Sequence, residues 1–144
     1  MAHNNKKCIY DNYKFDSYAE KDDYIYQKCS KDVKAVIVKP RFILQKGFSL
    51  INGKKIREIA FTPDLLLIFS AAYIQKHGFR YELRDTKPWN KKKGKFVLEP
   101  IFKLKWKMLK YKIFIYCSLK YTSPSGNGEM TIASMSNTRF TLTA

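Results

Sequence analysis

The sequence predicts a mixed α/β domain, and three observations support this fold class. The chain has 144 residues, 45% of them hydrophobic, which is enough to form one packed domain. A segment with helical spacing at residues 17–30 is followed by strand-like segments between residues 33 and 87. A second helical pattern begins near residue 100. The predicted order is helix, strand, hairpin, strand, strand, helix, strand, with acidic residues meeting at one end of a central sheet.

The first helix is predicted over residues 17–30. Ser17 and Glu20 have the spacing of a capping box, in which a hydroxyl and a carboxylate take up backbone N–H groups that the first turn leaves free. Apolar side chains recur at roughly helical spacing after this cap, at Tyr18, Ile25 and Cys29.

Strands are predicted directly after this helix. Residues 35–44 are rich in β-branched and apolar side chains, and a break is expected at Pro40, which cannot donate a ladder hydrogen bond. Asn52-Gly53 separates two further strand-like segments, residues 48–51 and 56–61. This pattern predicts a hairpin closed by a type I′ turn, whose two central residues both need positive φ.

The next two strands carry acidic residues. Leu65–Phe69 is apolar throughout, which predicts a central strand buried on both faces. A loop is predicted around residues 75–78, and another strand over residues 79–87. Because side chains alternate along a strand, one face of this strand carries Tyr81, Leu83, Asp85 and Lys87, and the other carries Arg80, Glu82, Arg84 and Thr86.

The following segments are a basic loop, a helix and a strand. Residues 88–97 predict the basic loop. Residues 99–111 fit a strand, through their alternation of apolar side chains with lysine, or a helix whose first turn holds Pro100; the helix is preferred. Residues 113–118 predict the last strand of the domain.

One domain is predicted over residues 1–118, followed by a tail. Residues 119–144 are rich in serine and threonine. Within this tail, residues 130–133 and 138–142 could pair as a hairpin.

The charge is strongly positive and unevenly distributed. The formal net charge is +16. Residues 1–32 hold six bases and six acids, whereas residues 33–144 hold 22 bases and six acids. A surface of this kind suits a polyanion, most often nucleic acid. A lysine bias from an AT-rich genome is the alternative, but it leaves the scarcity of acids after residue 33 unexplained.

Several site classes do not match the sequence. The three cysteines have no CxxC spacing and the chain has only two histidines, so an ordinary zinc site is not expected. There is no phosphate-binding glycine motif, and hence no nucleotide cofactor is expected. The N-terminus lacks a signal peptide and no segment has the length of a membrane span, so we expect a soluble cytoplasmic protein with reduced thiols.

One motif carries chemistry. Pro63-Asp64 and Asp85-Thr86-Lys87 together read PD…DxK. Carboxylates on neighbouring strands can bind Mg²⁺, and a lysine two residues after the second acid lies on the same strand face. Its ammonium can orient water or stabilise charge on a phosphate oxygen. The alternatives are an aspartate that only ends a turn and a surface ion pair between Asp85 and Lys87.

Other residues could complete such a site. Glu20 is either only the second member of the capping box or a third carboxylate. Trp89 and the lysines beside it could stack on a base and follow a phosphate backbone, although a solvated loop is the commoner outcome. The bases expected to contact nucleic acid are Lys91, Lys92, Lys93, Lys95, Lys103, Lys107 and Lys110.

The order of these motifs resembles a known group of proteins. The similarity covers roughly residues 10–112, and it includes the segments 14–20, 40–48, 56–59, 63–64, 85–87 and 102–111. These segments are similar to an uncharacterised family of small phage-encoded proteins placed in the PD-(D/E)XK nuclease superfamily. In size and motif order the chain also resembles T7-type junction-resolving endonucleases.

This resemblance implies a fold, an activity and partners. The fold is a restriction-endonuclease-like αβββαβ core with a mixed central sheet flanked by helices. The activity is Mg²⁺-dependent (or Mn²⁺-dependent) cleavage of DNA in phage recombination, replication or packaging, with branched DNA such as Holliday junctions as one expected substrate. The implied form is a homodimer in the bacterial host cytoplasm. Glu20, Asp64, Asp85 and Lys87 would be catalytic, and the three acids would bind the metal.

The chain departs from the family pattern at three positions. Lys39 stands where glutamine is more usual, Pro88 where glycine follows the motif lysine, and Asp85 where glutamate is commoner. The alternative function is a DNA-binding or adaptor protein that keeps the nuclease fold without its activity. RNA is a third possible substrate class.

Overall fold

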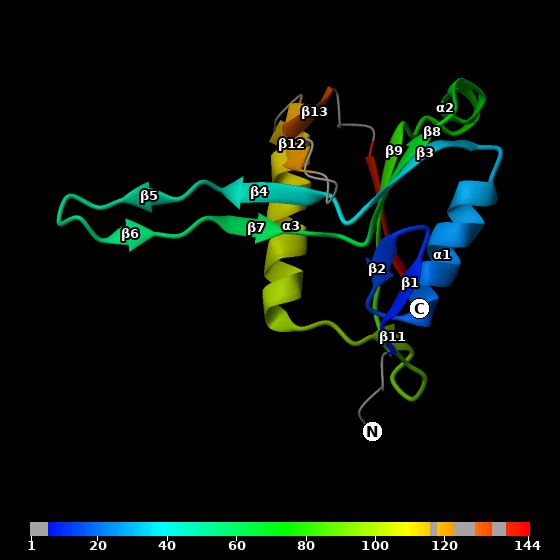
Figure 1. Ribbon diagram of the computed structural model, residues 1–144, viewed down its shortest axis with the longest axis horizontal. Coiled ribbons are helices and arrows are strands. Elements are labelled where there is room, and N and C mark those ends of the chain that lie inside the picture. The colour runs from blue at the N-terminus through cyan, green and yellow to red at the C-terminus, as the bar shows by residue number, and fades with distance from the viewer. Residues whose placement is uncertain (1–5, 116–117, 123–128, 134–137) are drawn as a thin grey trace.

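A mixed four-stranded sheet forms the centre of the computed structural model, which describes residues 6–115, 118–122, 129–133 and 138–144 (Figure 1). The strand order is β14-β9-β8-β3. Strands β8 and β9 pair antiparallel, as do β3 and β8, whereas β14 runs parallel to β9. The strands are β3 (Val33–Val38), β8 (Leu65–Phe69), β9 (Tyr81–Thr86) and β14 (Thr138–Thr143). The predicted mixed α/β class is therefore confirmed.

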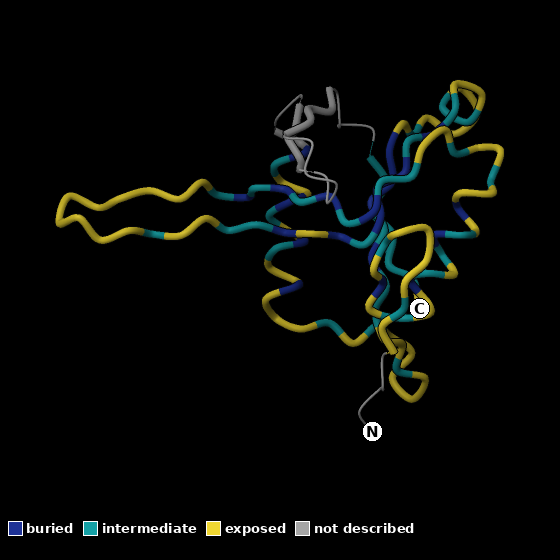
Figure 2. Tube along the Cα trace, viewed as in Figure 1, coloured by how far each residue is buried: buried dark blue, intermediate teal, exposed yellow. Residues whose placement is uncertain are grey.

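Helices cover both faces of this sheet. On one face, α1 (Tyr18–Cys29) packs against β3, and its Tyr24 is buried with Leu65 and Leu67 of β8. On the other face, α3 (Pro100–Ile115) lies over Leu66. Alternate residues of β8 thus enter two separate cores, which confirms the prediction of a strand buried on both faces (Figure 2).

A second four-stranded sheet packs against α3. Its strand order is β13-β12-β4-β7, and all of its pairs are antiparallel. The strands are β4 (Arg41–Gln45), β7 (Ile59–Phe61), β12 (Ser118–Thr122) and β13 (Glu129–Ala133). Phe42 and Phe61 of this sheet are buried with Trp106 of α3, which joins the sheet to the same core as β8.

The predicted hairpin extends from this sheet as a long arm. Strands β5 (Phe48–Ser49) and β6 (Lys55–Ile56) continue β4 and β7 away from the body (Figure 1). The predicted type I′ turn is wrong. Gly53 has φ 81°, but Asn52 is not among the residues with positive φ. Hydrogen bonds from Gly53 N–H to Leu50 C=O and from Leu50 N–H to Lys54 C=O instead close a longer loop, with glycine in the left-handed position.

Several short elements were not predicted, among them a hairpin near the N-terminus and the helix α2. Strands β1 (Cys8–Tyr10) and β2 (Tyr13–Phe15) form a hairpin whose two turn residues, Asp11 and Asn12, both have positive φ. The predicted loop at 75–78 is wrong over most of its length, because α2 (Ala71–His77) occupies it. Ser70 caps α2 by accepting the N–H of Tyr73, and Gly78 ends it in the left-handed conformation.

The C-terminal half departs furthest from the prediction. The helix starting at Pro100 is confirmed, but it continues to Ile115, so the strand predicted at 113–118 is wrong; β12 begins only at Ser118. The predicted pairing of residues 130–133 with 138–142 is wrong as well. Strand β13 pairs with β12, whereas β14 joins the central sheet beside β9. The described strands of the tail therefore belong to the two sheets of the body.

The basic loop contains a small hairpin. Strands β10 (Trp89–Asn90) and β11 (Lys95–Phe96) pair across it.

Across the described part of the chain, none of the helices combines the length and apolar content needed to span a membrane.

Candidate active site at the ends of β8 and β9

Asp64 and Asp85 face each other across two neighbouring strands. The antiparallel register pairs Leu65 with Arg84, so its extension by one residue places Asp64 opposite Asp85. The Oδ2 atom of Asp64 accepts the backbone N–H of Thr86 at 2.6 Å, which fixes its carboxylate at the end of β9. Like charges directly opposite each other are destabilising in a sheet. This arrangement therefore calls for a cation or a proton between the two side chains.

The backbone around Asp64 is held by the end of β3. Its carbonyl oxygen accepts the N–H of Lys39 at 2.8 Å, and Lys39 has φ 49°, a left-handed conformation that is uncommon for a residue other than glycine. Pro63 is buried directly before it. Such backbone conformations are kept where the surrounding structure determines them, often at functional sites.

Both aspartates hold protons more tightly than usual. Burial, followed by the negative charge of Asp85, raises the pKa of Asp64 to about 6, against the pull of the Thr86 N–H and of two lysines. Burial raises the pKa of Asp85 as well, and the charge of Glu20 acts in the same direction, whereas Lys87 opposes it. A site that raises the pKa of two carboxyl groups gains most from a ligand that neutralises them.

Lys87 lies on the same side of the strand end as Asp85, as the motif predicted. Its Nζ atom is 2.5 Å from Oδ1 of Asp85. The approach lies outside hydrogen-bond geometry, so that within the described structure this buried oxygen lacks an aligned donor. The ammonium also lies 4.1 Å from the centre of the Phe102 ring of α3. Lys87 is thus positioned by a carboxylate and by an aromatic ring.

Glu20 occupies the predicted cap position at the start of α1, and its role as a third carboxylate stays a prediction. Its backbone N–H donates to Oγ of Ser17 at 3.2 Å, as in a capping box, while its Oε2 accepts the N–H of Asp16 at 3.1 Å. Burial and the negative charge of Asp64 raise the pKa of Glu20. The negative charge of Glu20, which is part of α1, therefore interacts with the charges of both aspartates.

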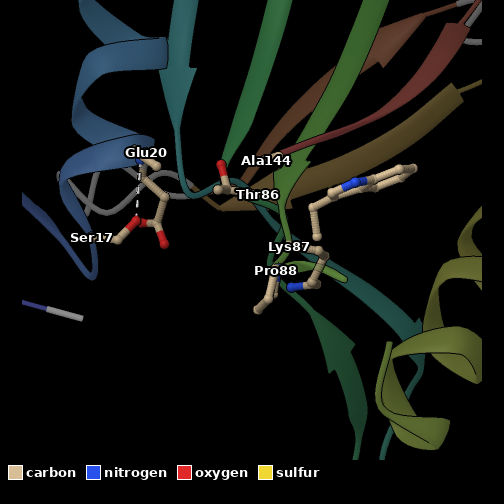
Figure 3. Close-up of a pocket in the computed structure, with 8 residues that line it drawn as sticks. Ser17, Glu20, Thr86, Lys87, Pro88 and Ala144 are labelled. Carbon is tan, nitrogen blue, oxygen red and sulfur yellow. Dashed lines mark hydrogen bonds between the residues drawn. The ribbon is translucent and has the colours of Figure 1, made fainter. Parts of the chain in front are cut away.

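The site opens into two adjoining hollows. One, with a volume of about 240 Å³, is lined by Glu20, Lys87 and the C-terminal Ala144 among others. In Figure 3, Ser17 and Glu20 form one wall, and Thr86, Lys87 and Pro88 form the other. The second hollow, about 340 Å³, extends past Lys87 toward Phe102. Neither Asp64 nor Asp85 is among the residues that line these two hollows, whereas Glu20 and Lys87 line both.

Glu82, the other acidic residue of β9, makes its contacts away from the aspartate pair. It is buried and accepts hydrogen bonds from Arg84 at 2.7 Å and Arg139 at 2.5 Å. Burial alone would raise its pKa, but the hydrogen bonds and positive charges around it lower the pKa overall. Arg84 also binds Asp23 of α1 through two hydrogen bonds, 2.9 and 3.0 Å long. This network holds α1 and β14 against β9 and leaves Glu82 no part in the site.

The acids fit a hard divalent cation with a partial set of protein ligands. Mg²⁺ is commonly held by one or two carboxylates, with water and phosphate oxygens completing the shell. Asp64 and Asp85 supply such a pair, in which Oδ1 of Asp85 is buried and has the Lys87 ammonium as its ion-pair partner. Within the described ranges, however, no three His, Cys, Asp or Glu side chains form a metal-binding group. The structure thus offers two aspartates, with Glu20 nearby, and not a closed cage.

The predicted nucleic-acid-binding residues fall into two groups. Lys91, Lys92, Lys93 and Lys95 are exposed on the β10–β11 hairpin, which leaves the site directly after Lys87. Beside them, Trp89 is 44% exposed and contacts Phe96 edge to face. Three bases of α3 are exposed and share one helix face, since they are spaced by four and three residues: Lys103, Lys107 and Lys110.

Sequence reasoning missed several contributors to the site. The Thr86 N–H, the Lys39 backbone and the Phe102 ring each position one of the predicted residues. Strand β14 also reaches the site, because the N–H of Lys87 donates to the carbonyl of Thr143 at 2.7 Å. A contact made by a backbone group leaves no signal in the sequence. Of these contributors, only Phe102 acts through its side chain and could have been suspected from the sequence.

Comparison with known proteins places the chain in a family. Residues 1–123 match the model of a family described as "Protein of unknown function (DUF1064)". The chain belongs to this family. Within DUF1064, the matched region includes all four predicted catalytic residues and ends before β14. Neither the curated proteins nor the solved structures include a match to the chain.

Proposed function

We propose that this DUF1064 protein is a Mg²⁺- or Mn²⁺-dependent DNA endonuclease of the PD-(D/E)XK type. The observation that carries the proposal is the placement of Asp64 opposite Asp85, with Lys87 against the second acid. The elements α1, β3, β8, β9, α3 and β14 support it, since in chain order, with the elements between them left out, they give the helix, three strands, helix and strand of the restriction-endonuclease-like core. In this proposal β14 would take the place of the last strand.

The proposed reaction is hydrolysis of a phosphodiester. A water oxygen bonds to phosphorus, the bond to the leaving sugar oxygen breaks, water loses a proton and the leaving oxygen gains one. Asp64 and Asp85 would hold the divalent cation, with Glu20 as a further oxygen ligand or an acceptor for a bound water. A cation held there supplies Lewis acidity and neutralises phosphate charge.

In this scheme the ammonium group of Lys87 would orient the attacking water or stabilise negative charge on a phosphate oxygen. In the free protein its ammonium is paired with Asp85. If Asp85 held a cation instead, the ammonium would be free to donate to a phosphate oxygen or to the attacking water. In the structure this ammonium also lies 4.1 Å from the centre of the Phe102 ring.

The surrounding charge supports a nucleic-acid substrate. Hairpin β10–β11 and one face of α3 both present exposed lysines, and Phe102 of α3 lines the second hollow together with Lys87. A helical polyanion that entered the hollow would meet cations on both flanks. We propose duplex or branched DNA as the substrate, acted on by a homodimer in phage recombination, replication or packaging.

The proposal is tested by a substrate panel. Purified protein with Mg²⁺ is incubated with four-way-junction, flap, duplex and single-stranded DNA, and with RNA of matched sequence. Asp64→Asn should abolish cleavage, whereas Asp32→Asn, which alters an exposed aspartate at the far end of β3, should not. An absence of metal-dependent cleavage on every substrate contradicts the proposal.

A second candidate is a DNA-binding or adaptor protein with this fold and without activity. The observation that favours it is the absence, among described residues, of a three-ligand metal group. This candidate predicts tight binding without cleavage by the wild type, and binding unchanged by Asp64→Asn.

A further inference from the structure

The β4–β7 hairpin forms an arm that stands out from the body. Beyond Gln45 and Ile59, both strands leave the second sheet and continue without cover (Figure 2). From residue 46 to residue 51 an extended chain spans about 17 Å. All the residues of the arm from 46 to 58 are exposed except Ile56. An element of this length that packs against little of its own chain is available to a partner.

The surface of the arm combines positive charge with apolar side chains near its tip. Four exposed bases lie along it: Lys46, Lys54, Lys55 and Arg57. Its one acid, Glu58, is paired with Arg41 at the root. Near the tip, the exposed fractions are 49% for Phe48 and 110% for Ile51. The basic side chains suit a polyanionic partner. The apolar side chains near the tip suit a partner that exposes apolar groups or the faces of aromatic rings.

The root of the arm joins the acidic site. Strand β7 ends at Phe61, and only Thr62 and Pro63 separate it from Asp64. At the other strand, β4 begins two residues after Lys39, whose N–H is bonded to the carbonyl of Asp64. A ligand lying across Asp64 therefore lies at the base of the arm.

The arm also has the slender shape of a groove-binding ribbon. A Cβ atom on Gly47 would approach the carbonyl oxygen of Ile56 to 3.1 Å and the nitrogen of Glu58 to 3.3 Å, so the two strands are close together there. A two-stranded ribbon fits the major groove of B-DNA, which is about 12 Å wide. Apolar side chains on DNA-binding elements can also wedge against base steps.

We infer that the β4–β7 arm binds the DNA groove next to the cleavage site, with its bases on the phosphates and Phe48 and Ile51 against bases or sugars. The inference rests on the proposed function, because it names the element that holds the same substrate. A second copy of the chain is the less favoured occupant, since two arms with this charge repel each other.

Binding is measured by fluorescence anisotropy of labelled duplex DNA over a series of salt concentrations, in the cleavage-dead Asp64→Asn protein. The arm variant carries Lys46→Gln, Lys54→Gln, Lys55→Gln and Arg57→Gln. Its matched control carries Lys31→Gln, Lys34→Gln, Lys76→Gln and Arg80→Gln, four exposed bases near α2 and the start of β3. We expect the slope of log affinity against log salt to fall by up to about 3.6 for the arm variant, at about 0.9 per phosphate contact, and to stay unchanged for the control.

A tip variant, Phe48→Ser with Ile51→Ser, separates the apolar contact from charge. It should weaken binding about tenfold with no change in the salt slope, because it removes contact area and no cation. Equal slopes for the arm and control variants overturn the inference. So does a tip variant that changes the mass in light scattering while its DNA affinity is unchanged, because the arm is then a protein interface.

These experiments distinguish a failure of the arm inference from a failure of the nuclease proposal. Loss of binding in the arm variant beside an inactive wild type supports the arm and contradicts the nuclease. Cleavage by wild type and arm variant alike, with equal salt slopes, supports the nuclease and overturns the arm.

Discussion

Asp64 accepts the N–H of Thr86 at 2.6 Å and lies opposite Asp85 in the register of β8 and β9. A buried carboxylate, Asp85, and a partly buried one, Asp64, are thereby held together at the end of a strand pair, where their mutual repulsion opposes folding. Such a pair lowers the free energy of unfolding of the metal-free protein, and a bound cation removes this destabilisation. Several measurable consequences follow from this relationship.

The first concerns stability and pH without metal. The native pKa of Asp64 is about 6, against 3.8 for an unperturbed aspartate. The native state therefore binds the proton more tightly than the unfolded state, and stability should fall as pH rises from about 4 to about 6. Asp64→Asn should raise the free energy of unfolding at pH 7 by an amount on the order of 3 kcal/mol. Urea denaturation in EDTA at pH 7 and pH 4 measures this, and a gain of equal size at both pH values contradicts it.

The second concerns metal binding without reference to activity. Mg²⁺ or Mn²⁺ that binds the native aspartate pair should raise the Tm of the wild type, and the rise should continue with the logarithm of the metal concentration above Kd. Asp85→Asn should abolish this rise, while the exposed control Asp32→Asn should keep it. Differential scanning calorimetry over a metal titration gives the shifts. An equal rise in all three proteins would place the cation elsewhere.

The third concerns Lys87. Its ammonium contacts Asp85 and the Phe102 ring, and it lines both hollows. Lys87→Met should lower the cleavage rate by on the order of 10²–10³ while DNA affinity and the metal-induced Tm shift stay near those of the wild type. Lys31→Met provides the exposed control. A parallel loss of affinity and rate would show that Lys87 only binds the substrate.

The fourth concerns the ion-pair network behind β9. Glu82 is buried between Arg84 and Arg139, so Glu82→Gln leaves two guanidinium groups without their shared carboxylate. We expect a loss of about 3–5 kcal/mol in the free energy of unfolding, measured by urea denaturation. Glu99→Gln, which alters an exposed glutamate, should change stability little. A small effect at Glu82 would mean that the network does not hold α1 and β14 to the sheet.

The fifth concerns β14. This strand pairs with β9 along its whole length, and its Phe140 contacts Trp106 edge to face. A chain that ends at residue 137 should therefore lose cooperative unfolding, or melt well below the full chain, in a circular dichroism melt. An unchanged melt would show that the tail is dispensable.

Parts of the site could be predicted because local rules determine them. Ser17 and Glu20 form the cap that their spacing indicates, and period-two alternation separates Asp85 from Glu82. The position of Asp64 followed from an apolar strand that begins directly after it. Each of these depends on residues close together in sequence, where spacing alone gives the geometry.

The remaining features depend on contacts between distant segments. Strand β14 pairs with a strand more than fifty residues earlier, and its alternation fits several partners equally well. The Asn52-Gly53 dipeptide predicted a tight turn, but the type I′ geometry lies at Asp11-Asn12 instead. Hairpin patterning also could not show that the β4–β7 strands leave the body, because an exposed ribbon and a sheet edge have similar composition.

The most direct test is single-turnover cleavage of a labelled four-way junction and its matched linear duplex, with protein in excess and Mg²⁺ added. We predict cutting of DNA by the wild type and by Asp32→Asn, none by Asp64→Asn or Asp85→Asn, and none in EDTA. Cutting that persists in both aspartate variants, or no cutting by the wild type on either DNA, contradicts the central claim that the facing aspartates form a nuclease site.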